Sequence, residues 1–231
     1  MMRKILHCLW ILNICLWTAS SAMAQEEAPF ELIKKLLPDN PVVIEAGAHF
    51  GEDTIIMSKL WPQGKIYAFE PSPESYQILT ADTATQPNVF SFPLALSDRN
   101  GELFFYLAGG ASSLKRPSKT FNDLYFHSDL DHPIVVQAIT LDDWANAHSV
   151  PKIDFIWFDM EGNELSAFKG ALQHLHQVKL IYTEVNFQKF WEGGVLYPEL
   201  KAWLAGHGFR EIWQESVPDW HGNVLFINEN L

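Results

Sequence analysis

Short apolar runs alternate with segments of mixed polarity along most of this 231-residue chain. The apolar runs are nearly continuous, which is typical of strands buried on both faces of a sheet. The segments between them have the spacing of helices that cover such a sheet. We predict strands at residues 42–44, 66–69, 89–94, 153–158 and 180–185, and helices at residues 30–37, 54–60, 74–81, 141–147, 164–175 and 197–206.

Two regions depart from this alternation. Extended segments at residues 101–107 and 134–139 flank a polar stretch, residues 109–133, and this order predicts a β-hairpin insertion with a long loop. The last two predicted strands, residues 209–213 and 224–227, have no helix between them, so one should run antiparallel. We therefore expect an α/β, Rossmann-like three-layer sandwich on a mostly parallel seven-stranded sheet with one antiparallel strand.

Residues 1–24 have the composition of a targeting segment. A basic start precedes an apolar run at residues 5–17 and the small residues Ala-Met-Ala at 22–24. This order predicts a secretory signal peptide cleaved before Gln25, and therefore a secreted or periplasmic chain with one domain over residues 25–231. The alternative is an uncleaved membrane anchor through the apolar run, although that run is shorter than the roughly 20 residues that span a bilayer.

The charge balance narrows the class of partner. The formal net charge of -12, from 16 basic and 28 acidic residues, argues against nucleic acid, because phosphate binding needs clustered Lys and Arg. An acidic surface is compatible with a cationic ligand and equally with simple solubility. Cys8 and Cys15 both lie in the predicted signal segment, so the mature domain should contain neither disulfides nor thiolate chemistry.

A glycine-containing turn follows the first predicted strand, with the sequence Glu-Ala-Gly-Ala-His-Phe-Gly over residues 45–51. Gly47 and Gly51 would let the backbone turn tightly and approach a ligand, with Ala48 between them. The turn fits the dinucleotide pattern G-x-G-x-x-G poorly, because it lacks the middle glycine. A carboxylate at Glu45 would repel a pyrophosphate but suit a cationic amino group. A purely structural turn is the alternative.

The ends of the next two strands add polar groups to the same expected edge. Glu70, with Pro71 after it, ends the second strand, and a carboxylate there can accept hydrogen bonds from both hydroxyls of a ribose. Ser97 and Asp98 follow the third strand, where they would border an adenine. The alternative at Asp98 is a simple turn, since residues 98–101 have turn composition.

Six motifs in the chain resemble, in the same order, those of FkbM-type methyltransferases. They lie at residues 44–51, 69–71, 95–98, 140–144, 159–164 and 169–171. The resemblance implies a class I methyltransferase fold, S-adenosylmethionine as methyl donor, and hydroxyl acceptors on sugars or small metabolites. It also implies that Glu45, Gly47 and Gly51 hold the methionine end of the donor and that Glu70 holds its ribose.

Three acidic residues at strand ends are the candidates for catalysis: Asp159, Glu161 and Glu184. Methyl transfer is an in-line displacement, and a base must assist when the acceptor is a poorly acidic hydroxyl. We favour Asp159, either as that base or as the residue that orients the acceptor. Glu161 and Glu164 also fit the start of a helix, where the helix dipole stabilises carboxylates.

Two alternatives concern the same chemistry. Asp159, Glu184 and Asn186 could offer oxygen ligands to a divalent metal, although we expect no resident metal. His127 and His132 lie in the predicted insertion and could each serve as the base instead.

The expected function is methylation of a sugar or small-metabolite hydroxyl by S-adenosylmethionine. The expected partner is a small-molecule or glycan acceptor, without a stable membrane partner if the signal is cleaved. Export conflicts with a cofactor made in the cytosol, so an exported, non-catalytic binding module with the same fold is the main alternative. A nicotinamide dinucleotide enzyme is disfavoured by Glu45 and the missing middle glycine.

Overall fold

The computed structural model describes residues 28–123, 132–215 and 220–231. The predicted signal or anchor and the candidate base His127 lie outside these ranges. Within them, the helices are too short or too polar to cross a membrane. The chain divides into two compact units, of which the first, up to Leu36, contains the helix α2 (Ala28–Leu36), and the second, Leu37–Leu231, contains the sheet and all the candidate site residues.

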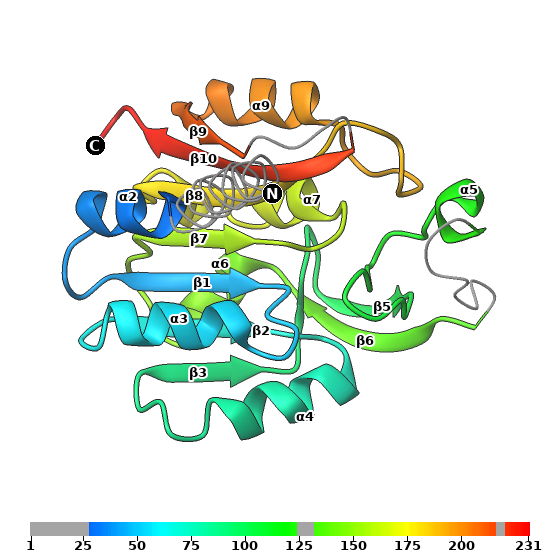
Figure 1. Cartoon of the computed structure of the whole chain (residues 1–231), viewed down its shortest axis with the longest axis horizontal. Helices are drawn as coiled ribbons and strands as arrows, with labels where there is room; N and C mark the ends of the chain where they lie inside the picture. Colours follow the sequence, from blue (N-terminus) through cyan, green and yellow to red (C-terminus); the bar gives the residue numbers. More distant parts are fainter. Residues whose placement is uncertain (1–27, 124–131, 216–219) are drawn as a thin grey trace, which may run out of the picture. The chain divides into compact units, whose positions relative to one another are not determined.

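The second unit is built on a seven-stranded sheet with the order β3-β2-β1-β7-β8-β10-β9 (Figure 1). Strand β10 runs antiparallel to both of its neighbours, and the other neighbouring pairs are parallel. This confirms the predicted fold and shows which of the last two strands is reversed. The strands are β1 (Val42–Ala46), β2 (Lys65–Phe69), β3 (Val89–Phe92), β7 (Phe155–Phe158), β8 (Leu180–Asn186), β9 (Phe209–Gln214) and β10 (His221–Asn228).

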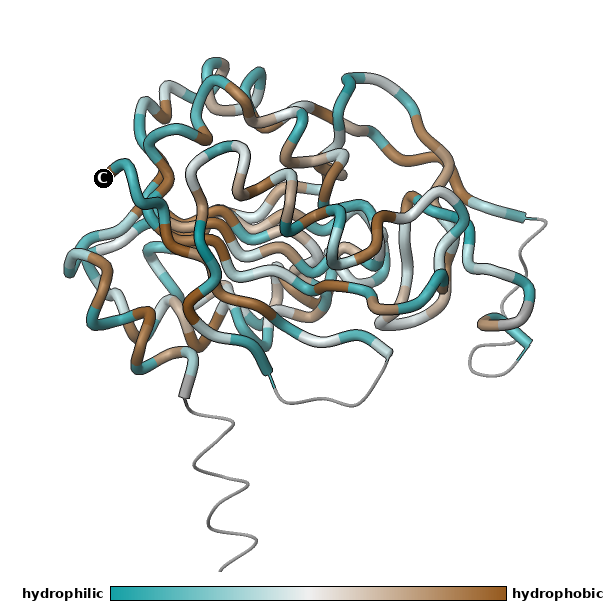
Figure 2. Tube along the Cα trace, turned by 90° about the horizontal axis from the view of Figure 1, so that it is seen from above, coloured by the Kyte–Doolittle hydropathy of each residue, from teal (hydrophilic) through white to brown (hydrophobic). Residues whose placement is uncertain are grey.

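Helices cover both faces of this sheet, as the near-continuous apolar strands require. Every residue of β7 and β8 is buried. One face carries α3 (Glu52–Leu60) and α4 (Pro73–Asp82), and the other carries α6 (Leu141–Ala147), α7 (Glu164–Lys169), α8 (Leu172–Leu175) and α9 (Tyr197–Gly206). The main core lies on the second face, where Trp144 and Phe168 pack against strand residues such as Phe158. Figure 2 shows apolar strands inside and polar turns outside.

Local sequence signals explain most helix boundaries. Ser72 caps α4 by accepting a hydrogen bond from the Ser75 N–H, and Thr140 caps α6 by accepting one from the Asp143 N–H. The prediction of one helix over residues 164–175 was wrong, because α7 and α8 are separate. At the break, a Cβ on Gly170 would lie 2.1 Å from the carbonyl oxygen of Ser97, so the chain passes too close to its neighbour for a larger residue.

The predicted hairpin insertion is part of a separate three-stranded sheet. Strand β6 (Ile134–Ile139) pairs antiparallel with β5 (Gly101–Phe105) and parallel with the short β4 (Ala95–Leu96). The predicted third strand therefore ends at Phe92, and the chain enters the small sheet directly afterwards. With α5 (Lys119–Phe121), this sheet lies beyond the carboxyl ends of β1 and β7 (Figure 1), where the functional groups were expected.

Candidate active site

The turn between β1 and α3 depends on glycine at two positions. Gly47 has a φ of +83°, and a Cβ there would lie 1.6 Å from the carbonyl oxygen of Asp159, so only glycine fits between β1 and the end of β7. Gly51 has a φ of +96° at the start of α3, against the side chain of Leu79. The N–H groups of Gly47 and Ala48 both donate to the carbonyl of Phe69 at 3.1 Å. The turn is thereby fixed to β2.

Glu70 faces this turn, as the sequence predicted. Its carboxylate accepts hydrogen bonds from the His49 N–H at 2.9 Å and from the Ser72 N–H at 2.8 Å. Burial raises the pKa of Glu70 to about 7, and the two backbone hydrogen bonds act in the opposite direction. Each carboxylate oxygen still has a second lone pair, so two ribose hydroxyls can donate to it.

Glu45 lies deeper, at the end of β1, with 2% of its surface exposed. It accepts a hydrogen bond of 2.6 Å from the hydroxyl of Thr54 on α3. Burial raises its pKa to about 8, the hydrogen bond from Thr54 lowers it, and repulsion from Asp53, Glu52 and Glu70 raises it further. Such a carboxyl group favours a ligand that brings positive charge.

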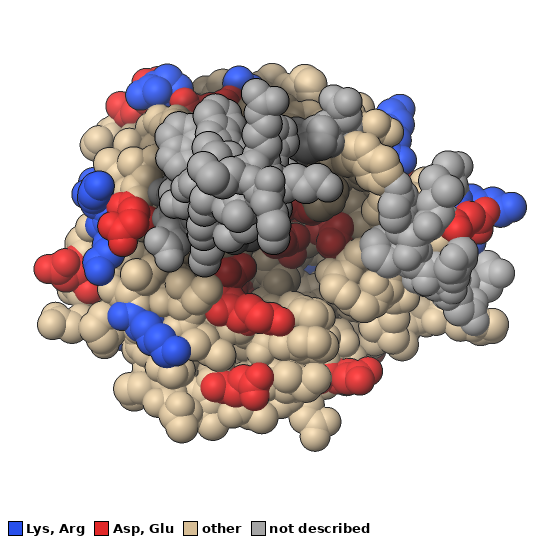
Figure 3. Space-filling model, viewed as in Figure 1, with Lys and Arg blue, Asp and Glu red and all other residues tan. Residues whose placement is uncertain are grey.

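A cavity of about 270 Å³ opens between these groups, a volume near the lower end for small-molecule sites. Its described lining includes five acidic side chains and neither Lys nor Arg: Glu45, Glu52, Asp53, Glu70 and Asp159. Apolar walls come from Phe69, Leu94, Leu96 and Phe105. In Figure 3, acidic side chains gather in the hollow at the middle of this face. The cavity therefore attracts cations and repels anions.

The backbone donors of the turn support the same conclusion. The N–H groups of Gly47, Ala48, His49 and Gly51 all donate to atoms of the protein. A pyrophosphate needs free N–H groups in such a turn. At these four positions the N–H groups already donate to protein atoms. A dinucleotide is therefore disfavoured both by the acidic lining and by the lack of free donors for its pyrophosphate.

The structure brings most predicted cofactor residues to the cavity, but not all of them. Ala48 and Pro71 line it together with Glu45, Gly47 and Glu70. Gly51 shapes the turn without lining the cavity.

Ser97 and Asp98 are a correction to the predicted set, because they line a neighbouring surface groove instead. The Ser97 N–H donates a hydrogen bond to the carbonyl of Ile139 on β6, which directs the chain away from the cavity. Ala95 and Leu96 line the cavity instead.

The three predicted catalytic carboxylates form a cluster at the ends of β7 and β8. One oxygen each of Asp159, Glu161 and Glu184 lies within 4.8 Å of the others. Asp159 borders the cavity and is open to it, although the surrounding walls displace much of the bulk water. This desolvation, together with repulsion from Glu184, raises the pKa of Asp159 well above its usual range.

Glu161 and Glu164 have different roles, although the sequence grouped them. Glu164 begins α7, and its Oε1 accepts hydrogen bonds from the N–H groups of Met160 and Gly162, so it stabilises the turn after β7. Glu161 lies within that turn, with a φ of 54°, and its carboxylate belongs to the cluster. The carbonyl of Glu161 accepts a hydrogen bond from the hydroxyl of Ser113, which links the insertion to this turn.

One neighbour of the cluster was missed by the sequence analysis. The Nδ1 atom of His221 lies 2.7 Å from Oε1 of Glu184, and 57% of the His221 side chain is exposed. His221 begins β10, and an antiparallel strand begins where its parallel neighbours end. The predicted antiparallel strand was a usable signal for His221, because the first residues of such a strand lie at the edge where the parallel strands end. His132, the candidate base inside the described ranges, is absent from the described cavity lining.

The methyltransferase FkbM domain matches residues 45–211, more than half of the chain. The chain belongs to the FkbM methyltransferase family. NoeI of Sinorhizobium fredii, a 2-O-methyltransferase, is 28% identical over 210 residues that cover 87% of this chain and 85% of NoeI. AglP of Haloferax volcanii, a hexuronic acid methyltransferase, is 23% identical over 162 residues, with coverages of 70% and 62%.

Solved structures confirm the fold of this FkbM family member. An rRNA methylase from Streptococcus thermophilus aligns with a TM-score of 0.51 at 11% identity, covering 88% of this chain and 96% of the methylase. Fibrillarin from Methanococcus jannaschii aligns with a TM-score of 0.51 at 15% identity, covering 84% and 69%. Family and fold are those of S-adenosylmethionine-dependent methyltransferases, and neither supports the non-catalytic alternative.

Proposed function

We propose that this chain transfers a methyl group from S-adenosylmethionine to a hydroxyl group of a sugar or another small molecule. The observation that carries the proposal is the cavity beside the glycine turn, which has five acidic side chains and neither Lys nor Arg among its described lining residues. S-adenosylmethionine carries a sulfonium and an amino group, so its positive charges match this lining. NoeI, which is named as a 2-O-methyltransferase, and AglP, which is named as a hexuronic acid methyltransferase, support the choice of acceptor.

The residues present fit the cofactor at both of its ends. Glu70 would accept hydrogen bonds from the ribose hydroxyls while it keeps its bonds to His49 and Ser72. Glu45, which has one hydrogen bond from Thr54, would face the amino-acid end across the glycine turn. Leu94, Leu96 and Phe105 offer an apolar wall for a base. When bound, the cofactor would supply an electrophilic methyl group.

Asp159 and the small sheet would position the acceptor. Asp159 borders the cavity and belongs to the carboxylate cluster, so its side chain would orient a hydroxyl toward the methyl group. Phe121 and Phe190 stack on each other beside Trp191 where the insertion meets the loop after β8. The buried Trp191 Nε1 has no hydrogen-bond partner among the described residues.

Thermal unfolding with S-adenosylmethionine tests the proposal directly. At a ligand concentration one hundred times the dissociation constant, binding should add about 2.7 kcal/mol to the stability of the folded protein. Glu70→Ala should lose most of this stabilisation, because the ribose contact is removed. Glu74→Ala is the matched control, since Glu74 is an exposed residue in the first turn of α4. No shift of the wild-type melt at millimolar cofactor would refute the proposal.

The acceptor class is tested by turnover. Methyl glucopyranoside and glucuronic acid serve as probes of a neutral and an anionic sugar, and formation of S-adenosylhomocysteine is measured. Methyl transfer to a hydroxyl of either sugar, located by NMR of the product, supports hydroxyl methylation, and transfer only to the carboxylate of glucuronic acid or to added thiols or amines contradicts it.

We also propose that the chain is exported, on the strength of the sequence of residues 1–24. Amino-terminal sequencing of the protein from the periplasm or medium should begin at Gln25. A start at Met1 in the membrane fraction would instead support the anchor.

A further inference from the structure

The side chains of Glu184 and His221 form a pair at the edge where the methyl acceptor would enter. The Glu184 carboxylate is buried, with 6% of its side-chain surface exposed, and its Oε1 lies 2.7 Å from Nδ1 of His221. With Nδ1 donating to Glu184, Nε2 is the ring nitrogen that can accept a proton. The side chain of His221 is largely exposed, so this nitrogen sits on a group that substrate can reach. A buried carboxylate that holds an accessible imidazole is the usual arrangement of a histidine base.

Strand register places this pair on the same face of the sheet as the cofactor cavity. Glu45 is opposite Trp157, and Trp157 is opposite Tyr182. Two residues further along β7 and β8 are Asp159 and Glu184, which therefore project on the face of Glu45, since side chains alternate along a strand.

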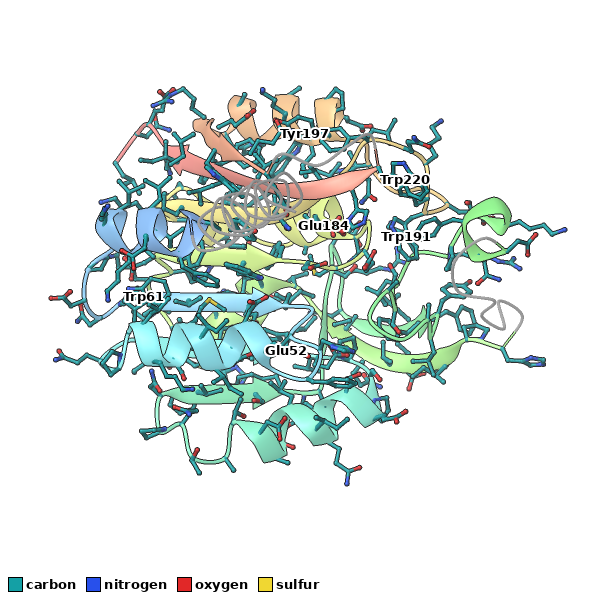
Figure 4. All side chains as sticks on the ribbon, in the orientation of Figure 1. Glu52, Trp61, Glu184, Trp191, Tyr197 and Trp220 are labelled. Carbon is teal, nitrogen blue, oxygen red and sulfur yellow. The ribbon has the colours of Figure 1, made fainter. Side chains whose placement is uncertain are left out.

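Strand β10 continues this face, because Asn186 is opposite His221 and Glu184 is opposite Asn223. Glu184 and His221 are thus diagonal neighbours across β8 and β10. Figure 4 shows the labelled Glu184 at the same end of the sheet as Trp191 and Trp220, with Trp61 at the opposite end.

The pair is also close to the group that borders the cavity. Oxygens of Glu184 and Asp159 lie within 4.8 Å of each other, and the charge of His221 acts electrostatically on Asp159. A hydroxyl that approaches Asp159 from the side of β8 therefore arrives next to His221.

The two exposed groups at this edge would have different roles. Asp159 borders the cavity, where its side chain would orient the acceptor hydroxyl. The imidazole of His221 is held at Nδ1 by Glu184 and is largely exposed, so its Nε2 can meet that hydroxyl. Glu184 itself is buried, so the acceptor hydroxyl cannot reach its carboxyl group directly.

We propose that His221 accepts the proton of the acceptor hydroxyl at Nε2 and that Glu184 is the positioning residue that holds the imidazole; this rests on the proposed methyltransferase function. In this step the O–CH₃ bond forms, the S–CH₃ bond breaks, and the hydroxyl proton moves to Nε2. The positive charge lost from sulfur reappears on the imidazolium, among the carboxylates of Asp159, Glu161 and Glu184. The site thus keeps its overall charge through the transfer.

Turnover by the full chain is the first test, with methyl glucopyranoside or glucuronic acid as acceptor. His221→Gln should lower kcat by roughly 10²- to 10⁴-fold, the usual contribution of a general base. The variant should keep the wild-type thermal shift with S-adenosylmethionine, and added imidazole should restore part of the rate. His176→Gln is the matched control: His176 is exposed and lies near Asn228, at the other end of β10.

The pH profile separates positioning from folding. Glu184→Gln should lower the plateau of the pH–rate profile while keeping the wild-type thermal shift with S-adenosylmethionine, because the imidazole loses the partner that orients it. The ionisable groups near the pair are Asp159 and Glu161 after β7, Glu164 on α7, Asp53 on α3 and Glu215 after β9. Each is an acidic side chain, and all five remain in this variant.

A second readout needs no acceptor. Nitrogen-15 NMR of the histidine rings should show the Nδ1–H tautomer for His221 in the wild type and a mixture of tautomers in Glu184→Gln. A wild-type Nε2–H tautomer would overturn the proposal. So would a His221→Gln rate within threefold of wild type, or turnover that EDTA abolishes and Mg²⁺ restores. Loss of the proposed function itself would appear differently, as a wild-type melt that does not respond to S-adenosylmethionine.

Discussion

The β1–β2 side of the cleft, formed by Glu45, the glycine turn and Glu70, contrasts with the β7–β10 side, formed by Asp159, Glu161, Glu184 and His221. On the first side each buried carboxylate meets hydrogen-bond donors of the protein: Thr54 for Glu45, and two backbone N–H groups for Glu70. On the second side three carboxylates face one another, and Oε2 of Glu184 has no hydrogen-bond partner among the described residues.

The difference indicates that the two sides have different roles. On the β1–β2 side the hydrogen-bond donors and acceptors of the protein are already paired with one another in the absence of ligand. The β7–β10 side keeps repulsion and an unsatisfied buried oxygen, which are expected where a ligand completes the structure. Substitutions on the β1–β2 side should therefore destabilise the folded protein, whereas removal of a charge on the β7–β10 side should stabilise it.

The largest effect is expected at Gly47. Gly47→Ala would place a Cβ 1.6 Å from the Asp159 carbonyl oxygen in a left-handed conformation, and should destabilise the protein by about 4 kcal/mol or more. Gly109→Ala is the matched control, since Gly109 also has positive φ but a Cβ there would meet no atom of the described residues within 4 Å, so only about 1–2 kcal/mol is expected. Urea unfolding measures both, and equal losses would contradict a close contact at Gly47.

The pH dependence of stability should be the next largest effect. Burial raises the pKa of Glu70 to about 7 and of Glu45 to about 8, from 4.5. Between pH 4.5 and 8 the folded protein binds more protons than the unfolded chain, so the free energy of unfolding falls as pH rises. Glu45 alone should contribute a loss on the order of 3 kcal/mol between pH 5 and pH 8, measured by urea unfolding. Glu45→Gln should flatten this curve, whereas a stability that rises with pH would contradict it.

The smallest effect should have the opposite sign on the two sides. At pH 8, Glu161→Gln should stabilise the protein by about 1 kcal/mol, because it removes a charge that repels Asp159 and Glu184. At pH 5, where ionisation of Glu70 costs little stability, Glu70→Gln should destabilise the protein by about 1 kcal/mol, because an amide can accept from only one of the two backbone N–H groups. Chemical unfolding of both variants provides the measurement. The comparison fails if both substitutions change stability in the same direction.

Prediction from sequence was most successful where the signals are local. The apolar runs identified the strands of the seven-stranded sheet, and the predicted helix over residues 141–147 coincides with α6. The glycine turn and Glu70 came together as expected, because parallel neighbours end at one edge. The continuous helix over residues 164–175 failed at Gly170, where the approach of Ser97, 73 positions earlier in the chain, decides the backbone path. A contact so distant in sequence leaves no local pattern.

The amino-acid sequence by itself determined the fold class, the family resemblance and the carboxylates after β1, β2 and β7, because strand periodicity and glycine spacing are properties of neighbouring residues. Only the tertiary structure decided that Ser97 and Asp98 leave the cavity, that Glu161 joins Asp159 and Glu184, and that His221 meets Glu184. The physical reason is strand direction and order: β10 is inserted next to β8 and reversed, which brings a residue near the end of the chain to the edge where the parallel strands end.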